Sequence, residues 1–248
     1  MDKMLYIAMT GAKQMMRAQV VNSNNMANIN TTGFRADLAS FKSMPVQGPG
    51  FQTRVYAEVS TDGSSTDLSP GPLSATGRDL DVALAGEGWI TVQGSDGKEG
   101  YTRAGNLTVS TTGVLETGTG YAVLTDAGPI TLPPYQKLDI AADGTIAIVP
   151  LGQSPSTQAV IGRIKLVNPA KDQMVKGSEG LMHLRDGSKA EPSAAVNLVA
   201  STLEGSNVSA ADSMTTMIEL SRQFEMQMKI MKAAEENDAA SAKLMMMG

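Results

Sequence analysis

Proline is confined to the middle of this chain. All eleven prolines lie between Pro45 and Pro192, so neither end contains one. Because proline removes a helical hydrogen bond and clashes with the preceding turn, long helices exclude it from their interior. The two ends of the chain are therefore predicted to be helical, and the region between them to have a different structure.

Within the first 30 residues, one series of residues recurs at steps of three and four. Such spacing places them on one face of a helix, as in a coiled coil. Two members of the series, Gln19 and Asn22, are polar. They lower the stability of helix pairing along this face but can fix its register. A helix of about 25 residues would be roughly 37 Å long, and it needs a packing partner to be stable. The series is Leu5, Ala8, Ala12, Met15, Gln19, Asn22, Met26 and Ile29.

The second proline-free end begins with a capping signal. Ser209 is followed three residues later by Asp212, which resembles a capping box. A helix from this point to about Leu244 would be roughly 50 Å long. Its apolar series also steps by three and four, and consists of Met214, Met217, Ser221, Phe224, Met228 and Met231. We therefore expect the two terminal helices to pair with each other.

Methionine is concentrated at the same two ends. Fourteen of the seventeen methionines lie in residues 1–35 or 205–248. Methionine is flexible and polarizable, so it suits surfaces that pack against several slightly different neighbours. An ordinary core is the usual explanation of such a series. Enrichment at both ends together favours an interface with other molecules.

Asparagine dominates the end of the first predicted helix, at five of the nine residues 22–30. Asn25 and Asn28 are three residues apart, so their amides point to one side and can bind the backbone of a neighbouring segment. Gly33 then supplies a turn, and Phe34 is a candidate apolar anchor. A simple helix cap followed by a loop explains the glycine well, but explains the paired asparagines less well.

The middle of the chain has the pattern of short strands. Residues 36–78 contain turn signals at 44–45, 48–50 and 69–72, a possible strand at 52–59 and a polar loop at 61–66, which indicates an extended connector. From residue 79, short apolar or alternating runs are separated by glycine, which predicts an antiparallel β domain. The expected strands are 81–84, 89–92, 101–103, 107–110, 114–116, 121–124, 130–132, 138–141, 145–149, 161–167 and 181–184, with a surface loop at 150–156.

The predicted fold class is therefore α+β. The N- and C-terminal helices pair as an antiparallel coiled-coil-like layer, and a central antiparallel all-β domain lies between them in sequence. We expect an N-terminal helix in residues 1–35, a connector in 36–78, a β-rich domain in 79–200 and a C-terminal helix in 201–248.

Composition excludes several classes of function. Cysteine is absent, so there is no disulfide framework and no thiolate chemistry. The net charge is −5 and no basic cluster occurs, so nucleic acid is not expected as a partner. No apolar run approaches the length of a membrane span. The apolar run 4–9 is too short for a cleaved secretory signal, so membrane insertion and signal-peptide export are not expected.

Candidates for catalysis are few. His183 is the only histidine and has no second ligand of its type, so a metal or catalytic role is not expected. Asp79, Asp81 and Glu87 form a small acidic group, and strand spacing would put the two aspartates on one face, as in a carbohydrate-active enzyme. Acids beside a strand are far more often surface residues. We predict no catalytic, cofactor-binding or metal-binding residues.

Four stretches resemble the family of bacterial flagellar rod and hook proteins. The first is Asn25-Met26-Ala27-Asn28 with Thr31 and Gly33-Phe34-Arg35, and it matches the family's N-terminal signature in spacing. The others, which together extend over most of the chain, are Leu80-Asp81-Val82-Ala83-Leu84 with Gly88-Trp89, Tyr101-Thr102-Arg103 with Gly105-Asn106-Leu107, and Leu203-Glu204-Gly205-Ser206-Asn207-Val208 with Met217-Ile218, Arg222, Phe224-Glu225 and Lys229.

This resemblance implies a structural role. It is closest to a proximal rod subunit, which would polymerise through its terminal helices into the axial tube that transmits torque and houses the export channel. The implied partners are copies of itself, other rod subunits and, during secretion, the flagellar export apparatus. The implied location is the periplasmic rod of the basal body, reached without a cleaved signal peptide. No cofactor is implied.

The residues expected at the assembly interface come from both terminal helices and from the N-terminal signature. They are Leu5, Ala8, Ala12, Met15, Asn25, Met26, Asn28, Ile29, Gly33, Phe34, Met214, Met217, Ile218, Phe224, Met228 and Met231. Three alternatives remain open from the sequence: a distal rod or hook subunit, a secreted carbohydrate-active enzyme, and a membrane-surface protein held by its methionine-rich helices. The last lacks the basic enrichment that such helices show.

Overall fold

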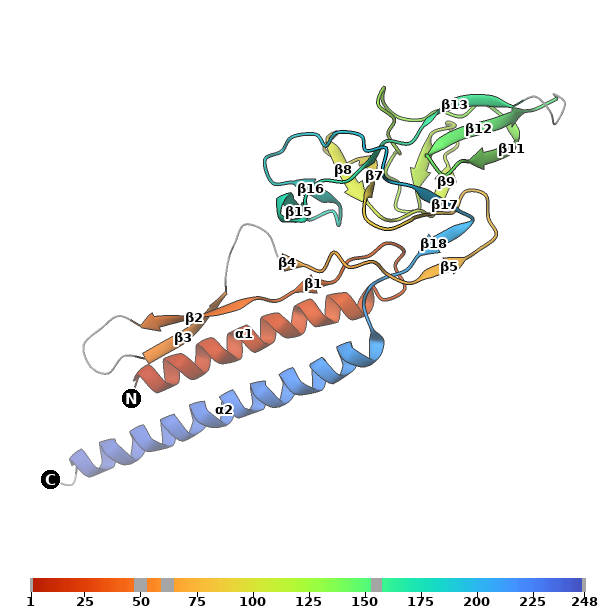
Figure 1. The fold of residues 1–248 in the computed structure, drawn as a ribbon. Helices are drawn as coiled ribbons and strands as arrows, with labels where there is room; N and C mark the ends of the chain where they lie inside the picture. Colours follow the sequence, from red (N-terminus) through yellow and green to blue (C-terminus); the bar gives the residue numbers. More distant parts are fainter. Residues whose placement is uncertain (1, 47–52, 59–64, 153–157, 247–248) are drawn as a thin grey trace. The chain divides into compact units, whose positions relative to one another are not determined.

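The computed structural model describes residues 2–46, 53–58, 65–152 and 158–246. Long helices lie at the two ends of the chain and antiparallel strands occupy the sequence between them, so the α+β prediction is confirmed (Figure 1). The chain forms two compact units. Unit 1 contains Met1–Ala27, Asp37–Ser65 and Ser209–Gly248, and unit 2 contains Asn28–Ala36 and Thr66–Val208.

Two helices dominate unit 1. Helix α1 spans Asp2–Ala27 and helix α2 spans Ala210–Met246, close to the predicted bounds. As expected from the sequence, Ser209 caps α2, because the backbone N–H of Asp212 donates to its Oγ over 3.4 Å. Among the described residues, neither helix combines the length and the apolarity that a membrane span requires.

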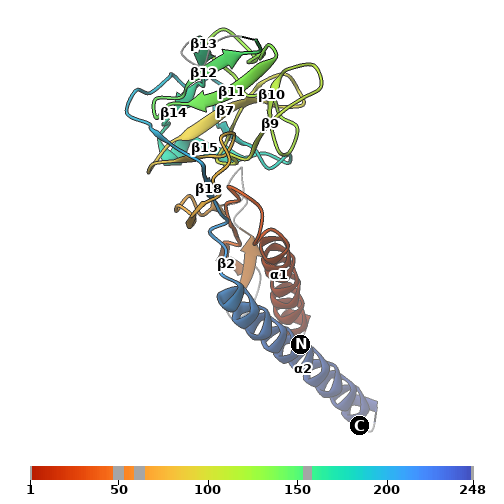
Figure 2. The same cartoon turned by 90° about the vertical axis from the view of Figure 1, so that its right-hand side faces the viewer.

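The two helices contact each other and run antiparallel. Near the end of α1, Asn22 Nδ2 donates to the backbone oxygen of Ser213 at the start of α2, over 2.8 Å. Nearer the beginning of α1, Gly11 lies against the side chain of Gln227, farther along α2. Both ribbon views show the two helices side by side (Figures 1 and 2).

A hairpin completes unit 1. Strands β2 (Phe41–Val46) and β3 (Thr53–Glu58) pair antiparallel, and β3 contacts α1. The predicted strand at 52–59 is thus confirmed. The chain continues as a strand through Pro45, which lies opposite Arg54. Proline is tolerated there because the described part of this sheet has only two strands, so β2 has an open edge. Short strand β1 spans Asp37–Leu38, and β4 spans Ser65–Thr66.

Unit 2 is built from antiparallel strands. Its described sheets are a five-stranded sheet in the order β14-β7-β8-β16-β15, a three-stranded sheet β11-β12-β13, and the pairs β9–β10, β6–β17 and β5–β18. The strands are β5 (Leu73–Ala75), β6 (Val82–Leu84), β7 (Trp89–Gln93), β8 (Glu99–Thr102), β9 (Leu107–Val109), β10 (Leu115–Thr117), β11 (Tyr135–Ile140), β12 (Thr145–Pro150), β13 (Ala159–Arg163), β14 (Leu166–Val167), β15 (Met174–Lys176), β16 (Met182–Leu184), β17 (Leu198–Ala200) and β18 (Thr202–Glu204), with a 3-10 turn at Lys171–Gln173.

The strand predictions were wrong in three ways. Segments 121–124 and 130–132 form only isolated bridges, such as Val92 with Val123. The single strand predicted at 161–167 is two strands, because β13 pairs with β12 whereas β14 pairs with β7. Strands β2, β5, β15, β17 and β18 were not predicted, and the turn predicted at 44–45 is wrong because these residues lie within β2. The turn predicted at 48–50 and parts of the loops predicted at 61–66 and 150–156 lie outside the described residues.

The core of unit 2 is conventional. Large apolar side chains from its sheets are buried together, including Ile90, Leu107 and Ile146, each 0% exposed. Burying one such side chain contributes about 1.5–3 kcal/mol. A second, smaller cluster surrounds Trp89 and Tyr101. Unit 2 therefore buries most of its large hydrophobic side chains.

Candidate assembly interface

Helix α1 has an unusual distribution of side chains. Its buried residues are small or polar: Ala8, Gly11, Ala12, Gln14, Ala18, Asn22 and Asn25. Several of its large apolar residues are exposed instead, namely Leu5, Tyr6, Met9, Met16 and Val20, at 41% to 68% of their accessible area. Four of these, at positions 5, 9, 16 and 20, share one side of the helix by their spacing. We call Leu5, Met9, Met16 and Val20 the outer face of α1.

Helix α2 presents a regular seam to α1. The buried or half-buried residues Ser213, Met217, Leu220, Phe224, Gln227, Met231 and Ala234 step by four and three along it. Two of them are fixed toward α1, since Ser213 accepts the bond from Asn22 and Gln227 touches Gly11. The remaining members lie on the same side by their spacing. The seam of α2 thus packs against the small-residue side of α1.

The residues predicted at the assembly interface occupy three environments in the structure. Those lying between the helices or half-buried beside them are Ala8, Ala12, Met15, Met26, Met217, Phe224 and Met231. Those exposed by about two fifths or more are Leu5, Met214, Ile218 and Met228. Asn25, Asn28, Ile29, Gly33 and Phe34 lie at or beyond the end of α1. Sequence reasoning missed Tyr6, Met9, Met16 and Val20, because they lie outside the single 3–4 series that runs from Leu5 to Ile29.

The two asparagines of the N-terminal signature have different surroundings. Asn25, still within α1, pairs with the backbone of Asp37, donating from Nδ2 over 2.8 Å and accepting at Oδ1 over 2.9 Å. It therefore binds the backbone of a neighbouring segment, one of the two uses expected from the sequence. Asn28 follows the helix and belongs to the turn, where its Oδ1 accepts from Thr31 over 3.1 Å.

A buried charge cluster in unit 2 connects the N-terminal signature to strand β18. The Glu204 carboxylate, 1% exposed, pairs with Arg35 and with Arg103, whose Nη1 lies 3.0 Å from Oε2. It also accepts the backbone N–H of Gly71 over 2.9 Å. Arg103 additionally donates to the backbone oxygen of Gly86 and stacks on Trp89. Burial lowers the pKa of the Arg35 guanidinium, and the Glu204 carboxylate opposes that shift.

Asn207 makes a second connection three residues after Glu204. Its Oδ1 accepts the backbone N–H of Ala36 over 2.8 Å, and its Nδ2 donates to the backbone oxygen of Asp67 over 3.0 Å. Glu204 and Asn207 therefore both link residues 33–36 to residues 67–72. Their only sequence signal was the motif shared with rod and hook proteins, which gives no role to either residue.

Glycine is required where these segments meet. Gly33 has φ +69°, as expected for a turn, and a Cβ there would lie 2.3 Å from the backbone carbon of Arg103. A Cβ on Gly71 would lie 2.2 Å from the backbone oxygen of Gly205. Phe34 follows Gly33, and the Lys176 ammonium lies 4.2 Å from its ring centroid while donating to the backbone oxygen of Arg35.

The acidic group does not form a paired-carboxylate site. The expectation that Asp79 and Asp81 share one strand face is wrong, because Asp79 lies in a turn and is exposed, whereas Asp81 is buried. Asp81 accepts from Thr76 Oγ1 over 2.7 Å and pairs with Arg78. Glu87 is on the surface and pairs with Lys171, which lowers its pKa. Asp81 and Glu87 therefore each form an ion pair with a basic side chain.

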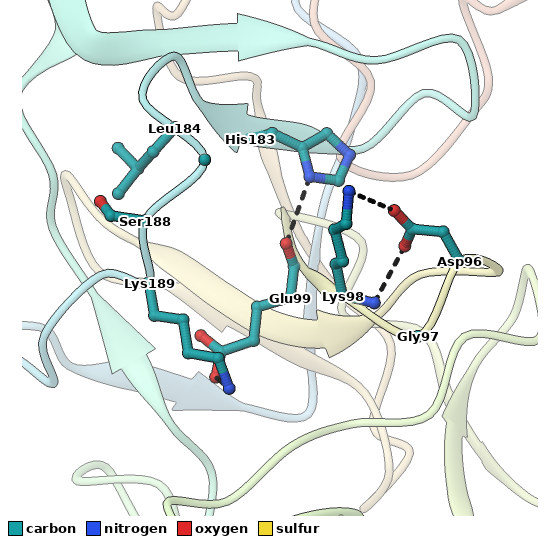
Figure 3. A pocket seen from close by; sticks show the side chains of 9 residues that line it. Asp96, Gly97, Lys98, Glu99, His183, Leu184, Ser188 and Lys189 are labelled. Atoms are coloured by element: carbon teal, nitrogen blue, oxygen red, sulfur yellow. Dashed lines mark hydrogen bonds and ion pairs between the residues drawn. The ribbon is translucent and has the colours of Figure 1, made fainter.

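A shallow cavity of about 350 Å³ surrounds the single histidine (Figure 3). His183 Nδ1 lies 3.2 Å from the backbone oxygen of Glu99. The charged side chains around it are paired, since Lys189 Nζ is 3.3 Å from Glu99 Oε1 and Lys98 Nζ is 3.6 Å from Asp96 Oδ2. In the part of the chain that the structure describes, no cluster of three potential metal ligands occurs.

Three family models match successive parts of the chain. The model described as "Flagella basal body rod protein" matches residues 5–35, the "Flagellar hook protein FlgE/F/G D1 domain" matches 83–148, and the "Flagellar basal body rod FlgEFG protein C-terminal" matches 199–244. These matches include α1, the central β region and α2. The chain belongs to the flagellar basal-body rod protein family, whose members are structural proteins rather than enzymes.

Within this family the chain is similar to the FlgF proteins. It is 42% identical over 253 residues to the flagellar basal-body rod protein FlgF of Salmonella typhimurium, with 100% of each chain covered. It is 39% identical to FlgF of Escherichia coli, again over 100% of each chain. FlgG of Bacillus subtilis is 31% identical, covering 95% of this chain and 96% of the relative. The chain is therefore a structural subunit of the basal-body rod, as the sequence predicted.

Proposed function

We propose that this chain is a proximal rod subunit that polymerises through its terminal helices. In this proposal α1 and α2 form a coiled-coil-like inner layer together with copies of this chain and with other rod subunits. The resulting axial tube transmits torque and houses the export channel. The chain reaches the periplasm through the flagellar export apparatus without cleavage of a signal peptide. The full-length similarity to FlgF proteins supports a place in the basal-body rod.

The observation that carries the proposal is the outer face of α1. Leu5, Met9, Met16 and Val20 are exposed on the side opposite the small residues that the helix buries. Removing one large apolar side chain from water contributes about 1.5–3 kcal/mol. A helix that exposes four of them leaves this hydrophobic face uncovered. Neighbouring subunits are the partners that a structural rod protein provides.

The residues of α1 that are fully buried are small or polar. They are alanine, glycine, asparagine and glutamine, which bury little apolar area, whereas Ile7, Met15, Val21 and Met26 are only half-buried. Met214, Ile218 and Met228 on α2 are also at least 45% exposed. Assembly would cover these side chains. The flexible thioethers of Met214 and Met228 suit contacts with non-identical neighbours, as occur at the ends of a short rod segment.

The test is a double substitution on the outer face, Met9→Gln with Met16→Gln. Glutamine keeps nearly the same helix propensity as methionine, so α1 is retained, but the apolar surface is lost. We expect the isolated variant to be as stable as the wild type. We also expect it to be absent from purified basal bodies, and the cells that produce it to be non-motile. The matched control, Met9→Leu with Met16→Leu, keeps the apolar surface and should incorporate. Normal incorporation of the glutamine variant would refute the proposal.

Rod position is tested separately by tagging. FlgG relatives align along nearly the whole chain, so a distal position is the second candidate. A tag on an exposed loop of unit 2, located in purified basal bodies, distinguishes the two ends of the rod.

A further inference from the structure

Three segments that are distant in sequence meet within unit 2. They are residues 33–36, 67–72 and 204–207, and we call them the junction segments. The first follows α1 in the chain, and the last precedes α2. The chain passes between the two units after residues 27, 36, 65 and 208, so each passage begins within or close to a junction segment.

Glu204 binds both of the other junction segments through one carboxylate. It pairs with Arg35 of the first segment and accepts the backbone N–H of Gly71 in the second. Arg103 of unit 2 shares the same carboxylate, and all three charged side chains are at most 4% exposed. Because two buried guanidinium groups depend on one carboxylate, loss of that carboxylate leaves uncompensated buried charge.

Asn207 binds the same two segments independently. It accepts from Ala36 of the first and donates to Asp67 and Ser69, at the start of the second. The backbone adds four further bonds. Gly33 N–H donates to the Glu204 oxygen and Gly205 N–H to the Pro72 oxygen, each over 2.8 Å, while Asp67 N–H donates to the Ala36 oxygen over 2.8 Å and Asn207 N–H to the Phe34 oxygen over 3.4 Å. Each junction segment is thus held by the other two.

We propose that Glu204 and Asn207 are positioning residues that make the three junction segments order as one cooperative unit. Residues 33–36 are then fully ordered only while residues 204–207 are docked, because the bonds from Lys176 to Arg35 and from Asp67 to Ala36 are not sufficient on their own. The proposal goes beyond polymerisation through the helices, because it concerns how unit 2 fixes the chain segments that precede α2 and follow α1. It also gives a role to the motif Leu203-Glu204-Gly205-Ser206-Asn207-Val208.

The experiment is hydrogen exchange of single amides in the purified full-length protein. For Asn207→Ala the reporter is the Gly33 amide, whose acceptor is the backbone oxygen of Glu204 and is unchanged by the substitution. For Glu204→Gln the reporter is the Ala36 amide, whose acceptor is Asn207. In each case the reporter is not bonded to the substituted side chain. A loss of protection therefore reports coupling rather than a lost acceptor.

Cooperative ordering predicts that both reporters lose protection by about tenfold or more. The control is Leu138→Ala, a core truncation in β11, which lowers the stability of unit 2 without touching the junction segments. It should leave the protection of Gly33 and Ala36 relative to the core amides unchanged. If Glu204→Gln fails to fold, as judged by Trp89 fluorescence, the Asn207→Ala result decides alone. Reporter amides that stay within about twofold of wild type in a folded variant would overturn the proposal.

Discussion

Unit 2 and helix α1 use their hydrophobic side chains in opposite ways. In unit 2, residues such as Ile90, Leu107 and Ile146 are fully buried. In α1, alanine and glycine are buried, whereas Leu5, Met9, Met16 and Val20 are exposed. Burial of large apolar side chains is the main favourable term in folding, so unit 2 has its stabilising core within one chain. The difference indicates that α1 obtains its main apolar contacts from other molecules, as we propose.

The largest expected effect is a difference in stability when one apolar side chain is truncated to alanine in each region. Ile146→Ala removes a fully buried side chain from β12 and should lower the free energy of unfolding by about 2–5 kcal/mol. Val20→Ala removes a side chain that is 68% exposed and should change it by less than about 0.5 kcal/mol. Urea denaturation followed by Trp89 fluorescence and by helical circular dichroism measures both. Equal losses would show that α1 has a conventional core of its own.

An intermediate effect tests the small-residue side of α1. Ala18 is 7% exposed, so Ala18→Leu inserts a large side chain where the helix is closely packed. We expect a loss of about 1–3 kcal/mol in the stability of the helix pair, with unit 2 unaffected. Ser23→Leu is the matched control, because it adds the same side chain at an exposed position of the same helix. If Ala18→Leu were as well tolerated as the control, the close packing of this side would be refuted.

The smallest expected effect concerns alkaline pH and unit 2 alone. Burial raises the pKa of the Tyr101 phenol, whose oxygen accepts the backbone N–H of Ala190. Below a pH of about 10, the pKa of tyrosine in the unfolded chain, the neutral phenol makes its full contribution to the stability of the folded state. This contribution is lost as the pH rises through the pKa of Tyr101 in the folded protein. The stability advantage of wild type over Tyr101→Phe should narrow between about pH 9 and pH 11. Thermal unfolding across this range measures it, and a constant difference would contradict the assignment.

Much of the fold was predictable because its signals are local. Exclusion of proline fixed the two helices, Ser209 marked the start of α2, and glycine between alternating runs indicated antiparallel strands. Some three-residue strands were missed, since three residues carry little periodicity, and the six-residue β2 was missed because Met44-Pro45 has the pattern of a turn. The junction of Glu204 with Arg35 and Arg103 was not predictable, because its members are 169 and 101 residues apart in the chain. Only folding brings them together.

Sequence alone determined that both ends of this chain are long helices, that the middle is antiparallel β, and that the chain resembles rod proteins. These properties follow from backbone sterics, capping chemistry and motifs that are contiguous in the chain. Tertiary structure decided which side of α1 is buried, because spacing shows which residues share a side and not which side finds a partner. It also decided that Asp81 is a structural acid and that Glu204 connects distant segments, since both depend on neighbours supplied by the fold.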